Sequence, residues 1–224
     1  MPVISAKLLD TMGGDGFIAS YARICTGGFD LATWDDPPND PDRDARTLRR
    51  LIRDGHASAF ETATCTLFLR CPRAIMDQVQ RHRTGAYLQK SQRHTKATDA
   101  PTITPEEVRL RHPEFGVHDI TMRRNASRKF NAAIRAATEA YKDLCDMGMV
   151  IEQARFALPL GIGTESSMTI NLRNLLHFLR LRQAPDAQHE IRILADQIAA
   201  AVALWVPLTW AAWTAATDAE RGRF

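Results

Sequence analysis

The side chains best suited to chemistry gather in one short stretch, residues 81–93 (RHRTGAYLQKSQR). This stretch combines cationic groups with hydroxyl and amide groups: Arg81, His82, Arg83, Lys90, Ser91, Gln92 and Arg93. Across residues 70–96, seven Lys and Arg side chains are balanced by Asp77 alone, which gives a local net charge of +6. Such crowding is unfavourable unless an anion lies among the cations, and forked guanidinium groups suit phosphate or carboxylate oxygens. The stretch predicts a site for a small anion, and the alternative is a solvated basic end of a helix.

A second group of amide and cationic side chains lies in residues 171–182 (NLRNLLHFLRLR). Four leucines follow the i, i+3, i+4, i+7 pattern of one buried helix face: Leu172, Leu175, Leu176 and Leu179. Asn171, Asn174 and Arg182 fall on a neighbouring face, and Arg173 with His177 forms another stripe. A merely amphipathic helix would show the same pattern. This segment therefore indicates a binding site only when it is taken together with residues 81–93.

The elements around these groups follow from periodicity and from turn residues. Residues 62–69 alternate between apolar and polar side chains, which predicts a strand. Pro72 suits the first turn of a helix that would carry Gln78, Arg81 and His82 near its C-terminal end. Further helices are predicted at residues 17–25, 44–54, after Thr104 and at about 120–149.

Length and composition predict one globular domain spanning residues 1–224. The chain is 45% apolar and 25% charged, and its net charge of +3 is too small to indicate a nucleic-acid partner. The four cysteines show no C-x-x-C pair and no zinc spacing, which indicates reduced thiols. No signal-like start and no apolar run of about 20 residues is present, so we expect a soluble, cytoplasmic protein without a membrane partner.

The first stretch resembles the signature of the flavin-dependent thymidylate synthases, Arg-His-Arg-x-x-Ser-x-Asn-x-x-Ser-x-Arg. The positions that match are Arg81, His82, Arg83, Ser91 and Arg93. Ala86 stands where the family has Ser, Leu88 where it has Asn, and His94 where Tyr is common. The hexapeptide 56–61 (HASAFE) is similar to the family element His-x-Ser/Thr-Pro-Phe-Glu, and residues 152–192 are similar to its second signature region.

The resemblance implies a fold, an assembly and a reaction. It implies an α+β protein with a mixed or antiparallel sheet and long helices, assembled as a homotetramer with each flavin between subunits. Members of the family transfer a one-carbon unit from methylenetetrahydrofolate to C5 of a uridine 5'-monophosphate, with NADPH reducing the FAD. Because the flavin supplies the redox chemistry, the protein has to supply orientation and charge.

The resemblance also implies roles for individual residues. It assigns flavin contacts to His56, Ser58, Arg81, His82, Arg83, Gln89, Asn171, Leu172 (through its backbone), Arg173 and His177. It assigns nucleotide contacts to Gln78, Arg81, Lys90, Ser91, Gln92, Arg93, Arg155 and Arg182. Arg182 is the expected catalytic residue, since a permanently charged guanidinium at the uracil edge would stabilise the N3-deprotonated pyrimidine. No metal ligand is implied.

The departures from the signature suggest an altered pocket. Ala86 and Leu88 remove two polar groups, and Gln89 replaces the family's usual Glu. One hypothesis is relaxed sugar recognition, so that UMP is accepted as well as dUMP, because a loose pocket rejects an added hydroxyl by only ~2–3 kcal/mol. Such a site would suit nucleoside-antibiotic biosynthesis, like the uridylate methylase of polyoxin biosynthesis.

Other functions stay open at this point. An ordinary dUMP-specific thymidylate synthase would explain the same residues, and so would a flavin- or nucleotide-binding homologue without catalysis. The sequence leaves open whether the product carries a methyl or a hydroxymethyl group. A basic nucleic-acid binder lacks stacking aromatics, at 7% of the chain, and a zinc enzyme lacks ligand spacing among His56, His82 and His94.

Overall fold

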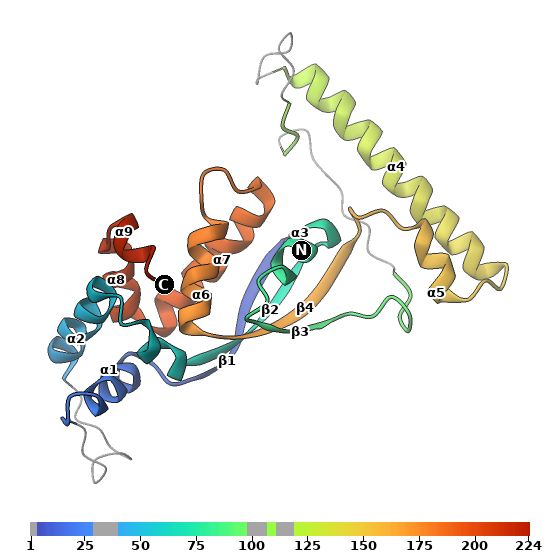
Figure 1. The fold of residues 1–224 in the computed structure, drawn as a ribbon. Coiled ribbons are helices and arrows are strands. Elements are labelled where there is room, and N and C mark those ends of the chain that lie inside the picture. The colour runs from blue at the N-terminus through green and yellow to red at the C-terminus, as the bar shows by residue number, and fades with distance from the viewer. Residues whose placement is uncertain (1–3, 29–39, 98–106, 111–118) are drawn as a thin grey trace. The chain divides into compact units, whose positions relative to one another are not determined.

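A computed structural model describes residues 4–28, 40–97, 107–110 and 119–224 (Figure 1). The strands are β1 (Ser5–Met12), β2 (Thr64–Pro72), β3 (Ala86–Gln89) and β4 (Gly163–Asn171). The helices are α1 (Asp15–Ile24), α2 (Pro41–Asp54), η2 (Ala57–Thr62), α3 (Arg73–Gln80), α4 (Ile120–Asp146), α5 (Ile151–Ala154), η3 (Arg155–Ala157), α6 (Leu172–Arg182), α7 (His189–Trp205), α8 (Pro207–Ala215) and α9 (Asp218–Arg221). The start of the helix predicted after Thr104 lies outside the described residues.

The four strands form one sheet in the order β1-β2-β4-β3. The predicted α+β class with an antiparallel sheet is confirmed. The residues group into two compact units, which we name after a helix of each. Among the described residues, the α4 unit contains 70–77, 89–97, 107–110 and 119–165, and the α6 unit contains 4–28, 40–69, 78–88 and 166–224.

Strand β2 is the centre of the apolar pattern. Its inward side chains are at most 2% exposed: Cys65, Leu67, Leu69 and Cys71. The predicted strand is therefore confirmed, and it continues beyond residue 69 because the alternation runs on through Cys71. Pro72 ends β2 instead of opening the helix, which starts at Arg73.

Helix α2 starts earlier than its apolar periodicity predicted. The Asp40 side chain accepts a hydrogen bond from the backbone N–H of Arg43 at 2.9 Å, and Pro41 occupies the first turn. Leu48, Leu51 and Ile52 are buried as predicted. The helix ends at Gly55, whose φ of 74° is a left-handed conformation that favours glycine.

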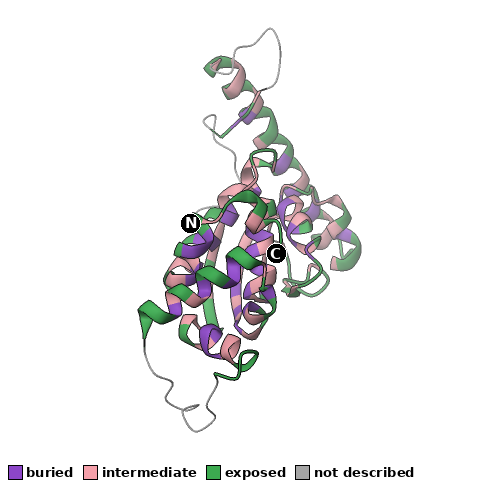
Figure 2. Ribbon diagram, turned by 60° about the vertical axis from the view of Figure 1, so that its left-hand side comes forward, coloured by how far each residue is buried: buried purple, intermediate pink, exposed green. Residues whose placement is uncertain are grey.

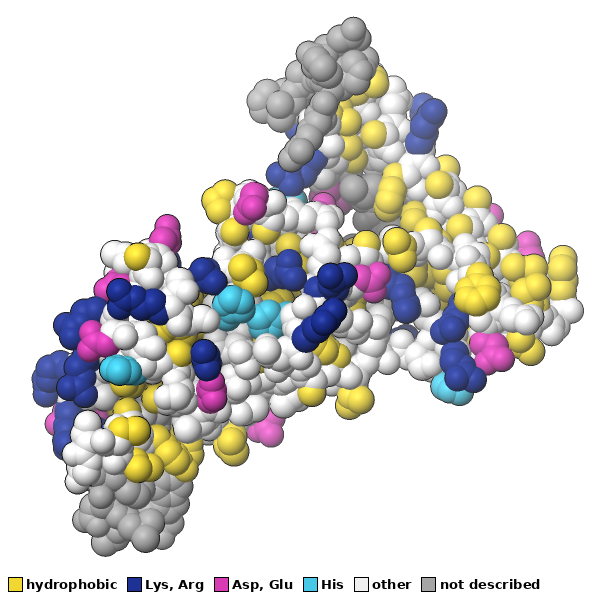
Figure 3. Space-filling model, in the orientation of Figure 1, with side chains coloured by type: hydrophobic (Ala, Val, Ile, Leu, Met, Phe, Trp, Pro, Cys, Tyr) yellow, Lys and Arg dark blue, Asp and Glu magenta, His cyan; other side chains and the backbone are white. Residues whose placement is uncertain are grey.

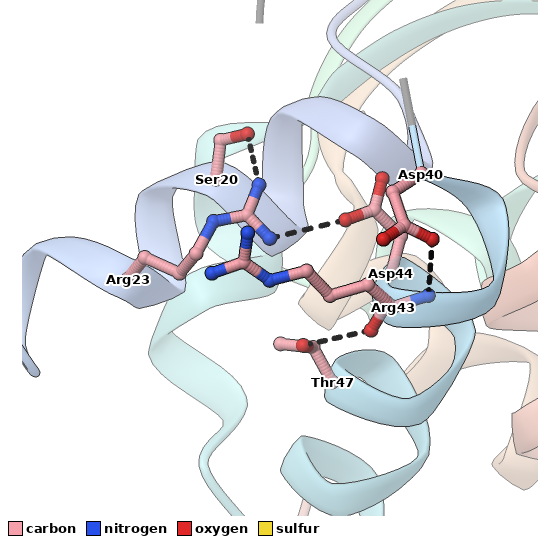
Figure 4. Close-up of polar contacts among 6 residues, drawn as sticks. All are labelled: Ser20, Arg23, Asp40, Arg43, Asp44 and Thr47. Atoms are coloured by element: carbon pink, nitrogen blue, oxygen red, sulfur yellow. Dashed lines mark hydrogen bonds and ion pairs between the residues drawn. The ribbon is translucent and has the colours of Figure 1, made fainter. Parts of the chain in front are cut away.

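A nearly buried ion pair joins α1 to α2 (Figure 4). Nη1 of Arg23 lies 3.1 Å from an Asp44 carboxylate oxygen, and Nη2 donates to the Ser20 hydroxyl at 2.8 Å. The two charged side chains are 14% and 7% exposed. Because removing one partner would leave a buried charge alone, this pair fixes how the two helices meet.

Helix α6 is fixed at its start and along one face. The Asn171 side chain accepts from the Asn174 N–H at 2.9 Å, which caps the helix. The Leu172 N–H donates to the carbonyl oxygen of Ala63 at 2.8 Å. All four leucines of the predicted stripe are fully buried (Leu172, Leu175, Leu176 and Leu179). Figure 2 shows this division of the helices into buried and exposed stripes.

The remaining helices of the α6 unit pack against β1 and α2. Helix α7 lies along β1, where the Ala6 N–H donates to the Gln197 side chain at 2.8 Å. Helix α8 starts at Pro207, the proline that interrupts the apolar run 198–213. The Asp15 carboxylate accepts from the N–H groups of Leu208 and Thr209 at 2.7 and 2.9 Å, which caps α8.

The α4 unit is built on the long helix α4, which spans Ile120–Asp146 where a helix was predicted at about 120–149. Ile134 and Tyr141 are buried, whereas Phe130 is 39% exposed. Periodicity identifies an apolar face but does not show what covers it. Met147 and Phe156 of this unit are each 81% exposed. None of the described helices is long and apolar enough to cross a bilayer.

Candidate functional site

The arginine stretch begins directly after α3 instead of inside it. The helix ends at Gln80, and the His82 N–H closes the turn by donating to the Val79 carbonyl at 3.0 Å. The Tyr87 hydroxyl hydrogen-bonds to the carbonyl oxygens of His82 and Val79 at 2.7 and 3.1 Å. Burial raises the pKa of Tyr87 to about 12, so this hydroxyl stays a donor at any ordinary pH.

His82 is the buried centre of the stretch, at 7% exposure. Its Nε2 lies 3.0 Å from the carbonyl oxygen of Asn174 in α6. Its ring meets Phe178 edge to face, with centroids 5.4 Å apart, and lies 5.6 Å from the His177 ring. Burial lowers the pKa of His82; the Asn174 carbonyl opposes this, and the charges of His177 and Arg182 add to it.

Arg182 and Gln78, both predicted at the nucleotide, lie together in the α6 unit. Arg182 Nη2 donates to the Gln78 backbone carbonyl at 2.8 Å, and its guanidinium carbon lies 6.0 Å from the Phe178 ring centroid. The Gln78 side chain in turn donates to Gln188 at 2.5 Å. Arg182 Nε is buried and has no partner within the described residues. A fixed cation with an unused N–H is suited to an acceptor that is not part of this chain.

The other predicted flavin residues surround this centre. Arg173 forms an ion pair with Glu61 of η2, and His177 lies beside Arg180. Burial lowers the pKa of His177, and the charges of Arg180 and Arg173 lower it further. Figure 3 shows histidine and basic side chains side by side on the surface near α6.

Four predicted flavin residues lie at the surface of the α6 unit. His56 precedes η2 and Ser58 lies within it, and both are exposed. Arg81 and Arg83 are also exposed, so their guanidinium groups are accessible to an anion. The Leu172 N–H already donates to Ala63, so a flavin contact through that N–H would have to replace this bond.

The α4 unit holds the remaining predicted nucleotide residues. Arg93 Nη2 lies 3.2 Å from a Glu152 carboxylate oxygen, with the two side chains 58% and 50% exposed. Arg155 Nε donates to the Glu152 backbone carbonyl at 3.2 Å. Arg73 Nη1 donates to the Gln92 side chain at 2.7 Å. Glu152 therefore brings Arg93 and Arg155 together within the unit.

The chain around residue 90 is fixed along the start of β4. The Lys90 N–H donates to the Glu165 carbonyl at 2.8 Å, and Glu165 pairs with Arg70. The Gln89 side chain donates to the Thr164 hydroxyl at 3.1 Å. Lys90 and Ser91 are exposed. These contacts leave the Lys90 ammonium and the Ser91 hydroxyl on the surface of the α4 unit.

Several side chains of the two groups were not identified from the sequence: Arg73, Tyr87, Glu152, Phe178 and Arg180. Arg180 could have been found, because it lies three residues after His177 on a predicted helix. Phe178 falls outside the four-leucine stripe that defined the buried face. Tyr87 and Arg73 carried no local signal, since their partners depend on the turn after α3 and on the tertiary fold.

Two of the four cysteines, Cys65 and Cys71, are buried. Burial raises the pKa of Cys65 and of Cys71 to about 12. A thiol with so high a pKa is protonated at neutral pH and is a poor nucleophile.

The comparisons with known proteins agree with one another. The model of the family described as thymidylate synthase complementing protein matches residues 7–208. A flavin-dependent thymidylate synthase of Kosmotoga olearia is 31% identical over 212 residues, covering 92% of this chain and 88% of that protein. One from Thermus thermophilus is 32% identical over 209 residues, covering 92% and 74%. The structure of a UMP/dUMP methylase, PolB, of Streptomyces cacaoi bound with 5-Br dUMP matches with a TM-score of 0.80 and 28% identity, covering 95% of each chain.

Proposed function

This chain belongs to the thymidylate synthase complementing protein family, that of the flavin-dependent thymidylate synthases, and is an enzyme; we propose that it methylates C5 of a uridine 5'-monophosphate, with FAD as cofactor. The observation that carries the proposal is Arg182. It is fixed on the Gln78 carbonyl and keeps a buried Nε–H without a partner in the described chain. That is the arrangement expected for a cation that receives a ligand acceptor.

The residues of the α6 unit fit a flavin. Exposed Arg81 and Arg83 offer guanidinium donors to its phosphates. His82 and His177, whose pKa values are lowered, offer neutral ring nitrogens. Bound FAD would supply the redox chemistry, while these residues bind and orient it. Contacts of His56, Ser58, Gln89, Asn171, Leu172 and Arg173 with the flavin stay predictions.

Arg182 is the residue we assign to the pyrimidine. A guanidinium stays charged at any working pH, so it can stabilise negative charge on the uracil ring when N3 loses its proton. The more electron-rich ring is then the better nucleophile at C5. Cys65 and Cys71 are protonated at neutral pH, which fits a route that needs no protein thiolate.

Recognition of the nucleotide phosphate is assigned to the α4 unit, chiefly to Arg93 and Arg155. Arg93 is now neutralised by Glu152 in an exposed ion pair, which is weak and can exchange its carboxylate for a phosphate. Lys90 and Ser91 lie exposed on the same unit and add donors. Gln92 contributes its side-chain amide next to Arg73.

We further propose that both UMP and dUMP are substrates, with methylenetetrahydrofolate as donor and NADPH as reductant. Similarity to a UMP/dUMP methylase supports the choice of nucleotide. Leu88 supports it as well, since an apolar side chain that is 80% exposed replaces a polar one of the signature. A role in nucleoside-antibiotic biosynthesis is part of this proposal.

Mass spectrometry of the products tests it. Purified protein with FAD, methylenetetrahydrofolate and NADPH should convert each nucleotide to a product heavier by one methylene group, and omission of either co-substrate should stop the reaction. Turnover of dUMP alone would identify a dUMP-specific thymidylate synthase. Binding of FAD without product from either nucleotide would identify a non-catalytic homologue.

Assembly and location complete the proposal. We infer that residues 1–224 act as one domain, since neither compact unit is continuous in sequence. A homotetramer would cover exposed apolar side chains such as Met147 and Phe156, and light scattering at several concentrations would measure it. A cytoplasmic location is proposed on the cysteine spacing alone.

A further inference from the structure

His177 and Arg180 make a contact that the family signature does not assign. Nη2 of Arg180 lies 3.3 Å from Nδ1 of His177, three residues earlier on the same helix. A guanidinium carries donors and no acceptor. Nδ1 of His177 must therefore accept, so the ring is neutral and its proton lies on Nε2.

The neighbouring ring, His82, also has one nitrogen fixed by a hydrogen bond, but in this ring the bonded nitrogen is a donor. Its Nε2 lies 3.0 Å from the Asn174 carbonyl oxygen, which can only accept. Nε2 of His82 therefore carries a proton, and Nδ1 of the neutral ring is an acceptor. The two ring centroids are 5.6 Å apart. The pair offers one N–H donor, from His177, and one lone pair, from His82.

The charges around the pair favour these neutral rings. Arg173 and Arg180 act on His177, and Arg182 acts on His82, each lowering the pKa of that ring. The one carboxylate recorded beside these arginines within the described residues, Glu61, is engaged by Arg173. Protonating His177 would also break its bond to Arg180, because Nδ1 would then be a donor facing a donor.

We propose that Arg180 is a positioning residue that holds His177 as an Nε2–H donor toward an acceptor atom of the bound flavin. The proposal rests on the proposed function, since it needs the isoalloxazine ring system, with its carbonyl oxygens and acceptor ring nitrogens, beside α6. The hydrogen bond that the structure gives for the Arg180 guanidinium is the Nη2 contact with His177, and its Nε is buried without a partner within the described chain. Without Arg180 the imidazole can flip and exchange tautomers.

Nitrogen NMR of the full chain with ¹⁵N-labelled histidine tests this, because it distinguishes protonated from unprotonated ring nitrogens. His177→Asn identifies the His177 signals. The native protein should show His177 with its proton on Nε2 alone. Arg180→Gln should give a mixture of tautomers, raise the midpoint of the His177 titration and weaken FAD binding by up to about tenfold, the loss expected for one neutral hydrogen bond.

Two further variants separate positioning from folding. Arg180→Lys keeps a cationic donor and should recover most of the single tautomer and of the FAD affinity. Arg46→Gln removes an exposed arginine of α2 and should change neither. Because Arg180 also lies near Gly222, circular dichroism and the unfolding midpoint are measured for each variant, and those of Arg180→Lys and Arg46→Gln should match the native protein.

Three outcomes would overturn the proposal. One is a native His177 with its proton on Nδ1, and another is an Arg180→Gln variant that keeps the native tautomer. The third is a changed tautomer with unchanged FAD affinity. A protein that shows the fixed tautomer in every preparation yet never binds FAD would contradict the proposed function, and it would leave the Arg180–His177 pairing in place.

Discussion

Arg182 and Arg93, the arginines assigned to the pyrimidine and to the phosphate, are held by different kinds of partner. In the α6 unit, Arg182 donates to a backbone carbonyl, that of Gln78. In the α4 unit, Arg93 pairs with the carboxylate of Glu152 at the surface. A carbonyl orients a guanidinium and leaves its charge in place, whereas a carboxylate neutralises it. Arg182 is therefore ready for a ligand, whereas Arg93 must first give up its carboxylate partner.

Residues of the two groups also differ in burial. His82 is 7% exposed, and burial lowers its pKa, so its hydrogen bonds are fixed by the surrounding fold. Arg93 is more than half exposed, and its ion pair contributes little to stability. We expect a change at His82 to affect both chemistry and folding, and a change at Arg93 to affect chiefly the nucleotide affinity.

The largest effect is expected at Arg182. Arg182→Lys keeps a positive charge but loses the planar fork and the Nε–H. We expect kcat to fall about 10²- to 10³-fold, as for loss of one preorganised donor to a developing anion. The flavin absorbance of the purified variant should be unchanged. Equal kcat in the two proteins would show that Arg182 does not contact the reacting ring.

Next in size is Arg93. Arg93→Gln should raise KM for the nucleotide by about 10- to 100-fold, because a charge-assisted hydrogen bond contributes about 1.5–3 kcal/mol. Steady-state kinetics with UMP and dUMP would measure this, and FAD affinity serves as the internal control. A variant with native KM would exclude Arg93 from phosphate binding.

His82 is expected to contribute both to FAD binding and to the stability of the fold. His82→Leu keeps the bulk against Phe178 but removes the imidazole donor to the Asn174 carbonyl, and loss of this one hydrogen bond costs about 0.5–1.5 kcal/mol of the free energy of unfolding. Urea denaturation would measure it. We also expect FAD binding to be lost. Native stability in this variant would contradict the buried hydrogen bond.

The pH dependence of stability tests the same ring and its neighbour. The pKa values of His82 and His177 are lowered in the folded state, so folding favours their neutral forms. Their contribution to stability is complete above the unfolded value of about 6.5 and is lost as pH falls through the lowered folded values. The free energy of unfolding should decrease below about pH 6.5, and less steeply in the variant His82→Leu with His177→Asn.

The smallest effect on stability is expected at Glu152. Glu152→Gln removes the carboxylate from Arg93, and an exposed pair contributes at most about 1 kcal/mol. Because the phosphate no longer competes with this carboxylate, nucleotide affinity should rise a few-fold, which isothermal calorimetry would detect. Weaker nucleotide binding would show that Glu152 helps to place Arg93 instead of competing for it.

The sequence predicted what depends on local periodicity. The alternation in β2 and the leucine stripe of α6 identified their buried faces, because each pattern repeats the geometry of its own element. The start of α2 was missed, because it is determined by Asp40 and Pro41 and the apolar pattern begins only later. The end of α3 was also missed, because Tyr87 and the turn after Gln80 determine it.

The sequence predicted which residues belong to the site, but it did not predict which groups they contact. The family signature named His82 and Arg182, yet their partners, the carbonyls of Asn174 and Gln78, lie about ninety and one hundred residues away. Backbone carbonyls carry no residue type that a pattern could identify. The Arg180–His177 contact, by contrast, is local, and i to i+3 spacing alone would have predicted it.

A flavin-fluorescence titration of the full chain tests the central claim most directly. The account predicts saturable FAD binding by the native protein, at least tenfold weaker binding by His82→Leu, and unchanged binding by Arg93→Gln. Absence of FAD binding by the native protein would contradict the account. So would an Arg93→Gln variant that loses FAD as fully as His82→Leu does.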